Sequence, residues 1–237
     1  MKAFTKEELQ RSMRLYAVTD RHWLKEKETL EDKCREALRG GITFLQLREK
    51  DADRAFVREE AEELQKLCRE KHIPFVIDDD IELAAELGLD GVHVGQKDLL
   101  KLMQSAGRRQ IEDMAADQAV LRVREIIGED RILGVSAETV EEAVLAEKAG
   151  ADYLGVGTVF PTSSKDDAIP VSHETLRAIC DAVSIPVVAI GGITRDNLQE
   201  LRGTGIDGIA VISAIFGQPD IQKASEDLFE KTACLMS

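Results

Sequence analysis

A recurring segment constrains the fold of this chain more than any other feature. Residues 88–94 read Gly-Leu-Asp-Gly-Val-His-Val, and similar segments recur at residues 150–156 and 205–211. Each begins with a glycine that can end a helix in the left-handed conformation and continues into a short apolar run typical of a buried parallel strand. The recurrence predicts a chain built from repeated helix-to-strand joints.

Further apolar runs complete a set of eight predicted strands separated by helical segments. They are Leu15–Val18, the apolar start of Phe44–Lys50, Phe75–Ile77, Ile132–Val135 and Val187–Ile190. Eight strands in a chain of 237 residues suit a single (β/α)8 TIM barrel, which we predict as one domain over residues 1–237. A doubly wound open sheet is the alternative. We disfavour it because no Gly-x-Gly-x-x-Gly follows the first strand.

Two segments add to the barrel pattern. Thr5 followed by Glu8 fits a capping box, which predicts a short amino-terminal helix within residues 1–13. Between the fourth and fifth strands, the chain is longer than one crossover helix needs. We interpret about residues 100–117 as an insertion, either an added helix or a lid-like excursion. A surface insertion without a part in the chemistry is the simpler interpretation.

Charge and composition exclude several classes of partner. The formal net charge of −14 disfavours a non-specific nucleic-acid or anionic-membrane surface. No apolar run approaches the roughly 20 residues that span a bilayer, and the first residues lack a secretory hydrophobic region. The cysteines lack metal-ligand spacing and suit reduced thiols: Cys34, Cys68, Cys180 and Cys234. We expect a soluble, cytoplasmic protein with small-molecule substrates. A homo-oligomer is compatible with the sequence.

Polar residues follow nearly every predicted strand, at the end of a barrel where active sites lie. They are Arg48, Glu49 and Lys50 after the second strand, Asp78 and Asp79 after the third, Gly95, Gln96 and Asp98 after the fourth, Ser136 after the fifth, Gly157 through Lys165 after the sixth, Gly191 and Gly192 after the seventh, and Ile212 and Ser213 after the eighth.

Two carboxylates among these residues, Asp79 and Asp98, follow neighbouring strands and could hold one divalent cation. Mg²⁺ suits such a site because it takes one or two carboxylates and keeps positions for water and phosphate oxygens. Backbone amides at Gly191–Gly192 and Ile212–Ser213 could bind a phosphate monoester. Basic side chains available for an anion beside the metal are Arg48, Lys50 and Lys165. The pattern predicts two phosphate-bearing ligands, one bound with metal and one without.

Purely structural roles are alternatives for the same residues. Asp79 and Asp98 could each cap the helix that follows, and Gly191–Gly192 could be only a tight turn. His93 lies inside an apolar strand, and we interpret it as a packed or barrel-lining residue rather than a catalytic base. Ser136 has no histidine nearby in a nucleophile motif, so we do not expect a covalent serine enzyme.

From Leu15 to about Phe216 the chain resembles the thiamine-phosphate synthase (thiamine-phosphate pyrophosphorylase) family. Each motif is modest alone, and their order makes the resemblance specific. The motifs are Gln46-Leu47-Arg48-Glu49-Lys50, Asp78-Asp79, Gly91 through Gln96 with Asp98, Gly134-Val135-Ser136, Pro161-Thr162-Ser163-Ser164-Lys165, Ile190-Gly191-Gly192-Ile193 and Val211-Ile212-Ser213.

The resemblance implies a transferase. It would join 4-amino-2-methyl-5-hydroxymethylpyrimidine diphosphate to 4-methyl-5-(2-phosphoethyl)thiazole, releasing diphosphate and forming thiamine phosphate. The family's mechanism is dissociative, through a pyrimidine cation, and Mg²⁺ is its cofactor. Related alternatives are a thiazole tautomerase of the regulator-like branch, which lacks the full diphosphate and metal set, and a non-catalytic binder of thiamine precursors.

Site residues follow from the same resemblance. Those implied for the pyrimidine diphosphate are Gln46, Leu47, Arg48, Glu49, Lys50, Asp78, Ser136 and Lys165. Those implied for the thiazole phosphate are Thr162, Ser163, Ser164, Gly192, Ile212 and Ser213. Asp79 and Asp98 would hold Mg²⁺. The residues expected to act in catalysis are Arg48, Lys50, Ser136 and Lys165.

Three departures from the family pattern stand out. Asp78 replaces the usual asparagine before the metal aspartate, which removes an amide donor and adds a negative charge. This change could weaken diphosphate binding or strengthen metal binding. Ser164 stands where threonine is usual and keeps the hydroxyl. The extra segment after Asp98 lies outside the common pattern.

Overall fold

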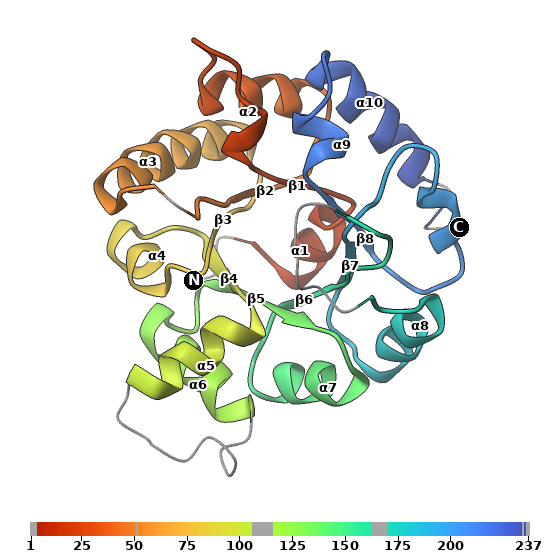
Figure 1. Ribbon diagram of the computed structural model, residues 1–237. Helices are drawn as coiled ribbons and strands as arrows, with labels where there is room; N and C mark the ends of the chain where they lie inside the picture. Colours follow the sequence, from red (N-terminus) through yellow and green to blue (C-terminus); the bar gives the residue numbers. More distant parts are fainter. Residues whose placement is uncertain (1–3, 51, 106–115, 163–169, 234, 236–237) are drawn as a thin grey trace.

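Eight parallel strands close into a barrel in this computed structural model, which describes residues 4–50, 52–105, 116–162, 170–233 and 235. Each strand pairs with its neighbours in sequence, and β1 pairs with β8 to close the ring (Figure 1). The strands are β1 Leu15–Val18, β2 Phe44–Leu47, β3 Phe75–Asp78, β4 Gly91–Val94, β5 Ile132–Ala137, β6 Tyr153–Val156, β7 Val187–Ile190 and β8 Gly208–Val211. The TIM-barrel prediction is confirmed.

Helices surround the barrel and bury the outward face of the strands (Figure 1). The helices of the described residues, including α1 at one end of the barrel, are α1 Lys6–Ser12, η1 Arg21–Trp23, α2 Leu30–Arg39, α3 Arg54–Lys71, α4 Ile81–Leu87, α5 Gln96–Ser105, α6 Ala116–Ile127, α7 Val140–Lys148, α8 His173–Ala182, η3 Leu198–Leu201, α9 Ser213–Phe216 and α10 Ile221–Thr232. Among the described residues, no helix is both long and apolar enough to cross a bilayer.

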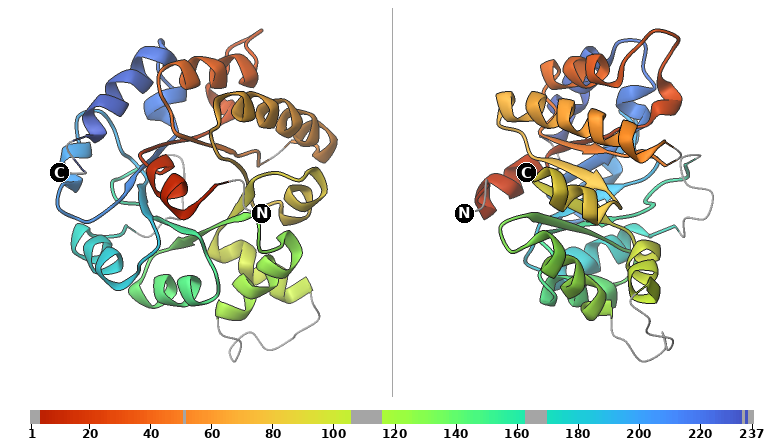
Figure 2. Two further views of the ribbon diagram at one scale, coloured as in Figure 1. Left: turned by 180° about the vertical axis from the view of Figure 1, so that it is seen from behind. Right: turned by 90° about the vertical axis from the view of Figure 1, so that its left-hand side faces the viewer.

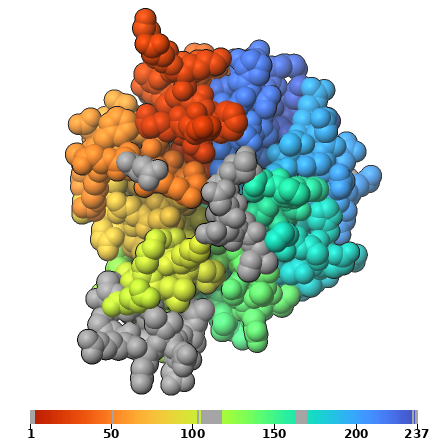
Figure 3. Space-filling view, viewed as in Figure 1, coloured from red at the N-terminus to blue at the C-terminus, as the bar shows by residue number. Residues whose placement is uncertain are grey.

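The amino-terminal helix α1 covers one end of the barrel. The predicted capping box is present, because Thr5 Oγ1 accepts from the Glu8 amide at 3.2 Å and Glu8 Oε2 accepts from the Thr5 amide at 2.8 Å. Leu9 and Met13 pack against side chains that point into the barrel. Figure 2 shows α1 at the end opposite the loops that leave the carboxyl ends of the strands. Figure 3 views the molecule from the side of those carboxyl ends.

The recurring joints have a shared structure at the amino ends of the strands. Their glycines, Gly88, Gly150 and Gly205, all have positive φ. Gly88 and Gly150 come at the ends of α4 and α7 as predicted, whereas Gly205 lies in a turn after η3, which ends at Leu201. The aspartate of each joint binds the backbone of the preceding strand. Asp90 accepts from the Phe75 amide at 3.0 Å, Asp152 from the Leu133 amide at 2.9 Å and Asp207 from the Val187 amide at 2.8 Å. Each aspartate therefore ties two neighbouring strands together.

A corresponding tie joins the first two strands. Thr43, which comes directly before β2, accepts a hydrogen bond from the Leu15 amide at 2.9 Å through its hydroxyl. The same hydroxyl donates to the carbonyl oxygen of Ser12 at 2.8 Å. Thr43 thus performs the function of the joint aspartates without their charge.

The connection from β4 to β5 contains two helices, α5 and α6, where one crossover helix would suffice. The predicted insertion at about residues 100–117 falls here. Residues 106–115 lie outside the described residues, so the lid-like interpretation stays a prediction, as does the assignment of residues 1–237 to one domain.

Candidate active site

Strand alternation points a row of polar side chains into the barrel near its carboxyl end. The register places Val18 beside Gln46, Asp78 beside His93, and Ser136 beside Gly155. Ser136 therefore lies within β5, which is longer than the sequence indicated. Gln96, at the start of α5, holds this part of β5 because its amide donates to the Ser136 carbonyl at 2.6 Å.

These side chains form one continuous hydrogen-bonded chain across the barrel interior. At one end, Gln46 Nε2 donates to Asp78 Oδ1, and Tyr16 Oη donates to Gln46 Oε1 at 2.9 Å. The hydroxyl oxygens of Tyr16 and Tyr153 lie 2.8 Å apart. At the other end, His93 Nδ1 lies 3.0 Å from Tyr153 Oη, and His93 Nε2 lies 3.0 Å from Ser136 Oγ. His93 is thus a barrel-lining residue, as the sequence indicated. It links Ser136, which is expected near the pyrimidine, to Tyr153.

Glycines on two strands make room for the rings in this chain. A Cβ atom at Gly134 would lie 2.2 Å from Tyr153 Cζ and 2.5 Å from His93 Nδ1. At Gly155 it would lie 3.0 Å from His93 Cε1. Burial raises the pKa of both Tyr16 and Tyr153 well above the usual tyrosine value, so both hydroxyls stay protonated.

Three consecutive aspartates after β3 have three different surroundings. Asp80 is the N-cap of α4 and accepts from the Leu83 amide at 2.9 Å, so it takes the capping role that the sequence also allowed for Asp79. Asp79 has a φ of 63°, and its amide donates to the His93 carbonyl at 2.9 Å. Asp78 points into the barrel and meets Gln46.

Asp79 and Asp98, the predicted metal ligands, meet at the carboxyl ends of β3 and β4. Burial, repulsion from Asp78 and Asp98, and a hydrogen bond to Asp98 raise the pKa of Asp79 to about 8. Asp98 lies in the first turn of α5 and accepts from Lys101 Nζ at 2.8 Å. The described residues contain no cluster of three or more His, Cys, Asp or Glu side chains suited to a metal. Two facing carboxylates nevertheless fit a cation that keeps water and phosphate ligands.

Arg48 lies beside Asp78, the neighbour of Asp79, with its side chain only 12% exposed. Its Nη1 is 3.6 Å from Asp20 Oδ2, and its Nε is 3.9 Å from Asp78 Oδ2. Lys50 is exposed at the same edge of the barrel. Asp78 therefore already neutralises part of the charge that Arg48 would offer to an anion.

The side chains of two residues expected to bind diphosphate, Leu47 and Glu49, are engaged in packing and in an ion pair instead. Leu47 packs in the core between strands and helices, so any contact with a ligand would involve its backbone. The carboxylate of Glu49 is buried and pairs with Arg21 Nε at 3.2 Å, and its pKa is raised by that burial. Their roles in binding stay predictions.

The expected thiazole-phosphate residues lie on the loops after β6, β7 and β8. Gly192 has a φ of 63°, and a Cβ atom there would lie 2.4 Å from the carbonyl oxygen of Pro161, the residue before Thr162. Ser213 is the first residue of α9, and Ile212 is its N-cap. Ser163, Ser164 and Lys165 lie outside the described residues. The structure thus brings Gly192 next to the loop of Thr162.

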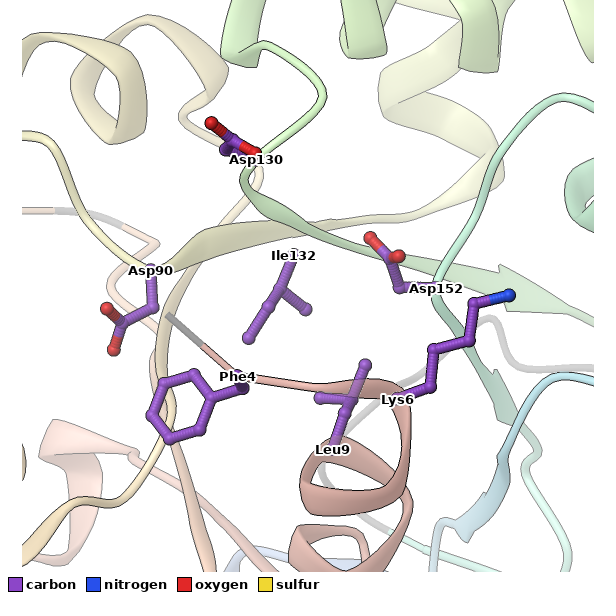
Figure 4. Close-up of a pocket in the computed structure, with 7 residues that line it drawn as sticks. All are labelled: Phe4, Lys6, Leu9, Asp90, Asp130, Ile132 and Asp152. Atoms are coloured by element: carbon purple, nitrogen blue, oxygen red, sulfur yellow. The ribbon is translucent and has the colours of Figure 1, made fainter. Parts of the chain in front are cut away.

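A small hollow lies at the opposite end of the barrel, beneath α1 (Figure 4). Its lining residues are Phe4, Lys6, Leu9, Asp90, Asp130, Ile132 and Asp152. Asp90 and Asp152 precede β4 and β6, which places the hollow at the amino ends of the strands. It is separate from the site residues predicted from the sequence.

Tyr16 and Gln96 contact expected site residues, and Tyr153 joins Tyr16 to His93, but none of the three was among the residues predicted to bind or react. Strand period could have identified the tyrosines, because Tyr16 lies two residues before Val18 and Tyr153 two residues before Gly155, both on the inward face. The strands are apolar on both faces, which hides that alternation.

Comparisons with known proteins agree with this geometry. Residues 15–215 match the family model described as "Thiamine monophosphate synthase". The thiamine-phosphate synthases of Clostridium tetani and Ruminiclostridium cellulolyticum are each 46% identical to this chain, over 90% and 91% of it and 93% of each relative. A solved thiamine phosphate pyrophosphorylase from Pyrococcus furiosus superposes with a TM-score of 0.79 at 40% identity, covering 97% of this chain and 100% of that one. The chain belongs to the thiamine monophosphate synthase family.

Proposed function

We propose that this protein condenses 4-amino-2-methyl-5-hydroxymethylpyrimidine diphosphate with 4-methyl-5-(2-phosphoethyl)thiazole to give thiamine phosphate and diphosphate. The observation that carries the proposal is the meeting of Asp79 and Asp98 next to the Asp78–Arg48 pair at the carboxyl end of the barrel, in a chain of this family. Carboxylates next to a half-buried guanidinium suit a diphosphate bound together with a cation.

The reaction replaces one bond by another. The carbon–oxygen bond to the diphosphate breaks, its electron pair leaves with the diphosphate oxygen, and the thiazole nitrogen then bonds to the pyrimidine methylene carbon. Electron donation from the aminopyrimidine ring stabilises the cation between the two events. This mechanism needs no protein nucleophile.

The protein's own groups stabilise the leaving diphosphate and orient the acceptor. Arg48 and Lys50, with Lys165 as a further expected contact, offset the negative charge that develops on diphosphate. Mg²⁺ held by Asp79 and Asp98 would add electrostatic stabilisation of the same charge. Backbone amides near Gly192 and Ser213, with the hydroxyl of Thr162, would hold the thiazole phosphate so that its ring nitrogen faces the methylene carbon.

An assay with both substrates tests the proposal. Purified protein, the two phosphorylated substrates and Mg²⁺ are expected to give thiamine phosphate and diphosphate in equal amounts, and a chelator is expected to stop the reaction. Folded protein that forms neither product contradicts the synthase. The same experiment separates it from a thiazole tautomerase, which would interconvert thiazole phosphates, and from a binder that retains ligands unchanged.

Binding of Mg²⁺ is expected to release a proton near neutral pH. The pKa of Asp79 is raised to about 8, so at pH 7 most of its carboxyl groups carry a proton that a metal ion must displace. Titration calorimetry in two buffers with different ionisation enthalpies measures the released proton. The apparent affinity should rise up to about tenfold per pH unit below pH 8. Asp79→Asn is the control and should release no proton when it binds Mg²⁺. Identical binding heats in both buffers for the wild-type protein would contradict a protonated Asp79.

We further propose that the protein acts in the cytoplasm on small molecules, with neither nucleic acid nor membrane as a partner. Its net charge of −14 supports the absence of a polyanionic partner. Cys34 and Cys68 are buried free thiols, in keeping with a reducing compartment. A homo-oligomer is compatible with these features.

A further inference from the structure

The hydrogen-bonded chain inside the barrel has a direction that can be deduced residue by residue. We name it the interior chain; its members in order are Asp78, Gln46, Tyr16, Tyr153, His93 and Ser136. One end lies beside Arg48, and the other end is a serine expected near the pyrimidine. Between them, each contact has one donor and one acceptor, so the assignment at one end limits all the others.

The Asp78 end determines the first two contacts. A carboxylate only accepts hydrogen bonds, and Asp78 Oδ1 accepts from Gln46 Nε2 while Asp78 Oδ2 lies 3.9 Å from Arg48 Nε. The amide nitrogen of Gln46 must therefore face Asp78, which turns Gln46 Oε1 towards Tyr16. The single hydroxyl hydrogen of Tyr16 is then used on Gln46.

The same argument continues to the other end. Because the Tyr16 hydrogen is committed to Gln46, the Tyr16 oxygen must accept from the hydroxyl of Tyr153. The Tyr153 oxygen can then only accept, so His93 must carry its hydrogen on Nδ1. A neutral imidazole has one ring hydrogen, which leaves His93 Nε2 to accept from the hydroxyl of Ser136.

Burial and packing keep this assignment intact. Tyr16 and Tyr153 are 1% and 0% exposed, so water does not replace their partners. Their raised pKa values keep one hydrogen on each hydroxyl. Gly134 and Gly155 leave a slot that fits the rings of Tyr153 and His93 in their present positions.

We propose that Asp78 is a positioning residue that sets the direction of the interior chain, holding His93 as the Nδ1–H tautomer and leaving the lone pairs of Ser136 Oγ to accept from a ligand. An asparagine, which is usual in the family at this position, can present either its oxygen or its nitrogen to Gln46 and so does not impose one direction. The ligand group that suits Ser136 is an N–H donor. On the proposed function this is the 4-amino group of the pyrimidine.

The tautomer of His93 is the direct test. Nitrogen-15 NMR of the full-length protein, labelled at its four histidines, distinguishes Nδ1–H, Nε2–H and doubly protonated rings, and His93→Gln assigns the signal. We expect a neutral Nδ1–H ring for His93 at pH 8. An Nε2–H or doubly protonated ring overturns the proposal. This measurement needs no substrate and is independent of enzymatic activity.

Three variants test the role of Asp78. Asp78→Asn and Tyr16→Phe remove the constraint at the end and in the middle of the interior chain, so the His93 signal should shift towards the Nε2–H form. Asp79→Asn removes the same charge one residue further along but lies off the interior chain, and it should leave the signal unchanged. A wild-type signal in Asp78→Asn, or an equal shift in Asp79→Asn, overturns the role of Asp78. Tyr16→Phe remains informative if Asp78→Asn folds poorly.

Ligand binding tests the consequence for Ser136. Without the thiazole phosphate no condensation occurs, so calorimetry can compare the aminopyrimidine diphosphate with an analogue carrying hydrogen in place of the amino group. The wild-type protein should bind the amino compound at least about fivefold more tightly, the effect of one oriented hydrogen bond. In Ser136→Ala this ratio should fall close to one. An unchanged ratio overturns the role of Ser136, whereas absence of condensation in the assay above would affect only the proposed function.

Discussion

Replacing Asp79 by asparagine should remove most synthase activity and at the same time stabilise the metal-free protein at alkaline pH. Asparagine tolerates the φ of 63° at this position, so the backbone should keep its conformation. Loss of one of two metal carboxylates should lower kcat/KM by about 100-fold or more, because stabilisation of the leaving diphosphate is weakened. Steady-state kinetics at low Mg²⁺ measures this loss.

The gain in stability follows from the raised pKa of Asp79. Its value of about 8 in the folded protein exceeds the roughly 4 expected when unfolded, so between these values the folded state binds more protons. Stability from this group is therefore full at low pH and is lost as the pH rises from about 4 to 8. Urea unfolding with a chelator should show Asp79→Asn to be more stable than wild type at pH 8 but not at pH 4.

Asp80→Asn is the matched control for this experiment. Asparagine caps helices about as well as aspartate, so α4 should be retained. The ion pair of Asp80 with Arg54 is largely exposed and contributes little. Activity should stay within about twofold of wild type, since none of the proposed catalytic interactions is removed. If Asp79→Asn keeps full activity at low Mg²⁺, the assignment of Asp79 as a metal ligand is wrong.

Asp152→Ala should cause a large loss of stability, about 3–5 kcal/mol, because it leaves a buried guanidinium without its counter-charge. Arg124 is 5% exposed, and its Nη2 donates to Asp152 Oδ2 at 2.7 Å. The same carboxylate oxygen accepts from the Leu133 amide, so the substitution also frees a backbone donor at the start of β5. Equilibrium unfolding in urea measures the change.

The exposed pair Arg177–Asp181 provides the comparison. It has the same charges at 3.9 Å, but its side chains are 67% and 73% exposed. Asp181→Ala should therefore change the free energy of unfolding by less than about 1 kcal/mol. Similar losses for Asp152→Ala and Asp181→Ala would show that burial of the Arg124 pair contributes nothing.

Much of the fold could be predicted because local signals agreed with the final packing. Gly88 and Gly150 mark helix ends, and the capping box at Thr5 marks a helix start. Asp79, Asp98 and Arg48 each follow a predicted strand, and parallel strands of a barrel end at one face, so the sequence predicts that these residues lie on the same face. These signals are local or follow from topology alone.

The remaining features depend on side-chain directions that the sequence does not specify. Three adjacent aspartates gave no sign of which would cap α4, and the backbone conformation at Asp79 assigns that role to Asp80. The inward tyrosines Tyr16 and Tyr153 meet only because barrel closure brings β1 and β6 across the interior from each other. Such a contact joins residues far apart in the sequence and carries no local signal.

The side-chain hydrogen bonds at the amino ends of the strands join the eight strands in four pairs. Thr43 joins β1 to β2, Asp90 joins β3 to β4, Asp152 joins β5 to β6, and Asp207 joins β7 to β8. The β4–β5 connection, with its extra helix, joins the second of these pairs to the third. Added chain there separates no tied pair. The extra helix therefore lies between two strands that share none of these four ties, so added chain at this position leaves each tie in place.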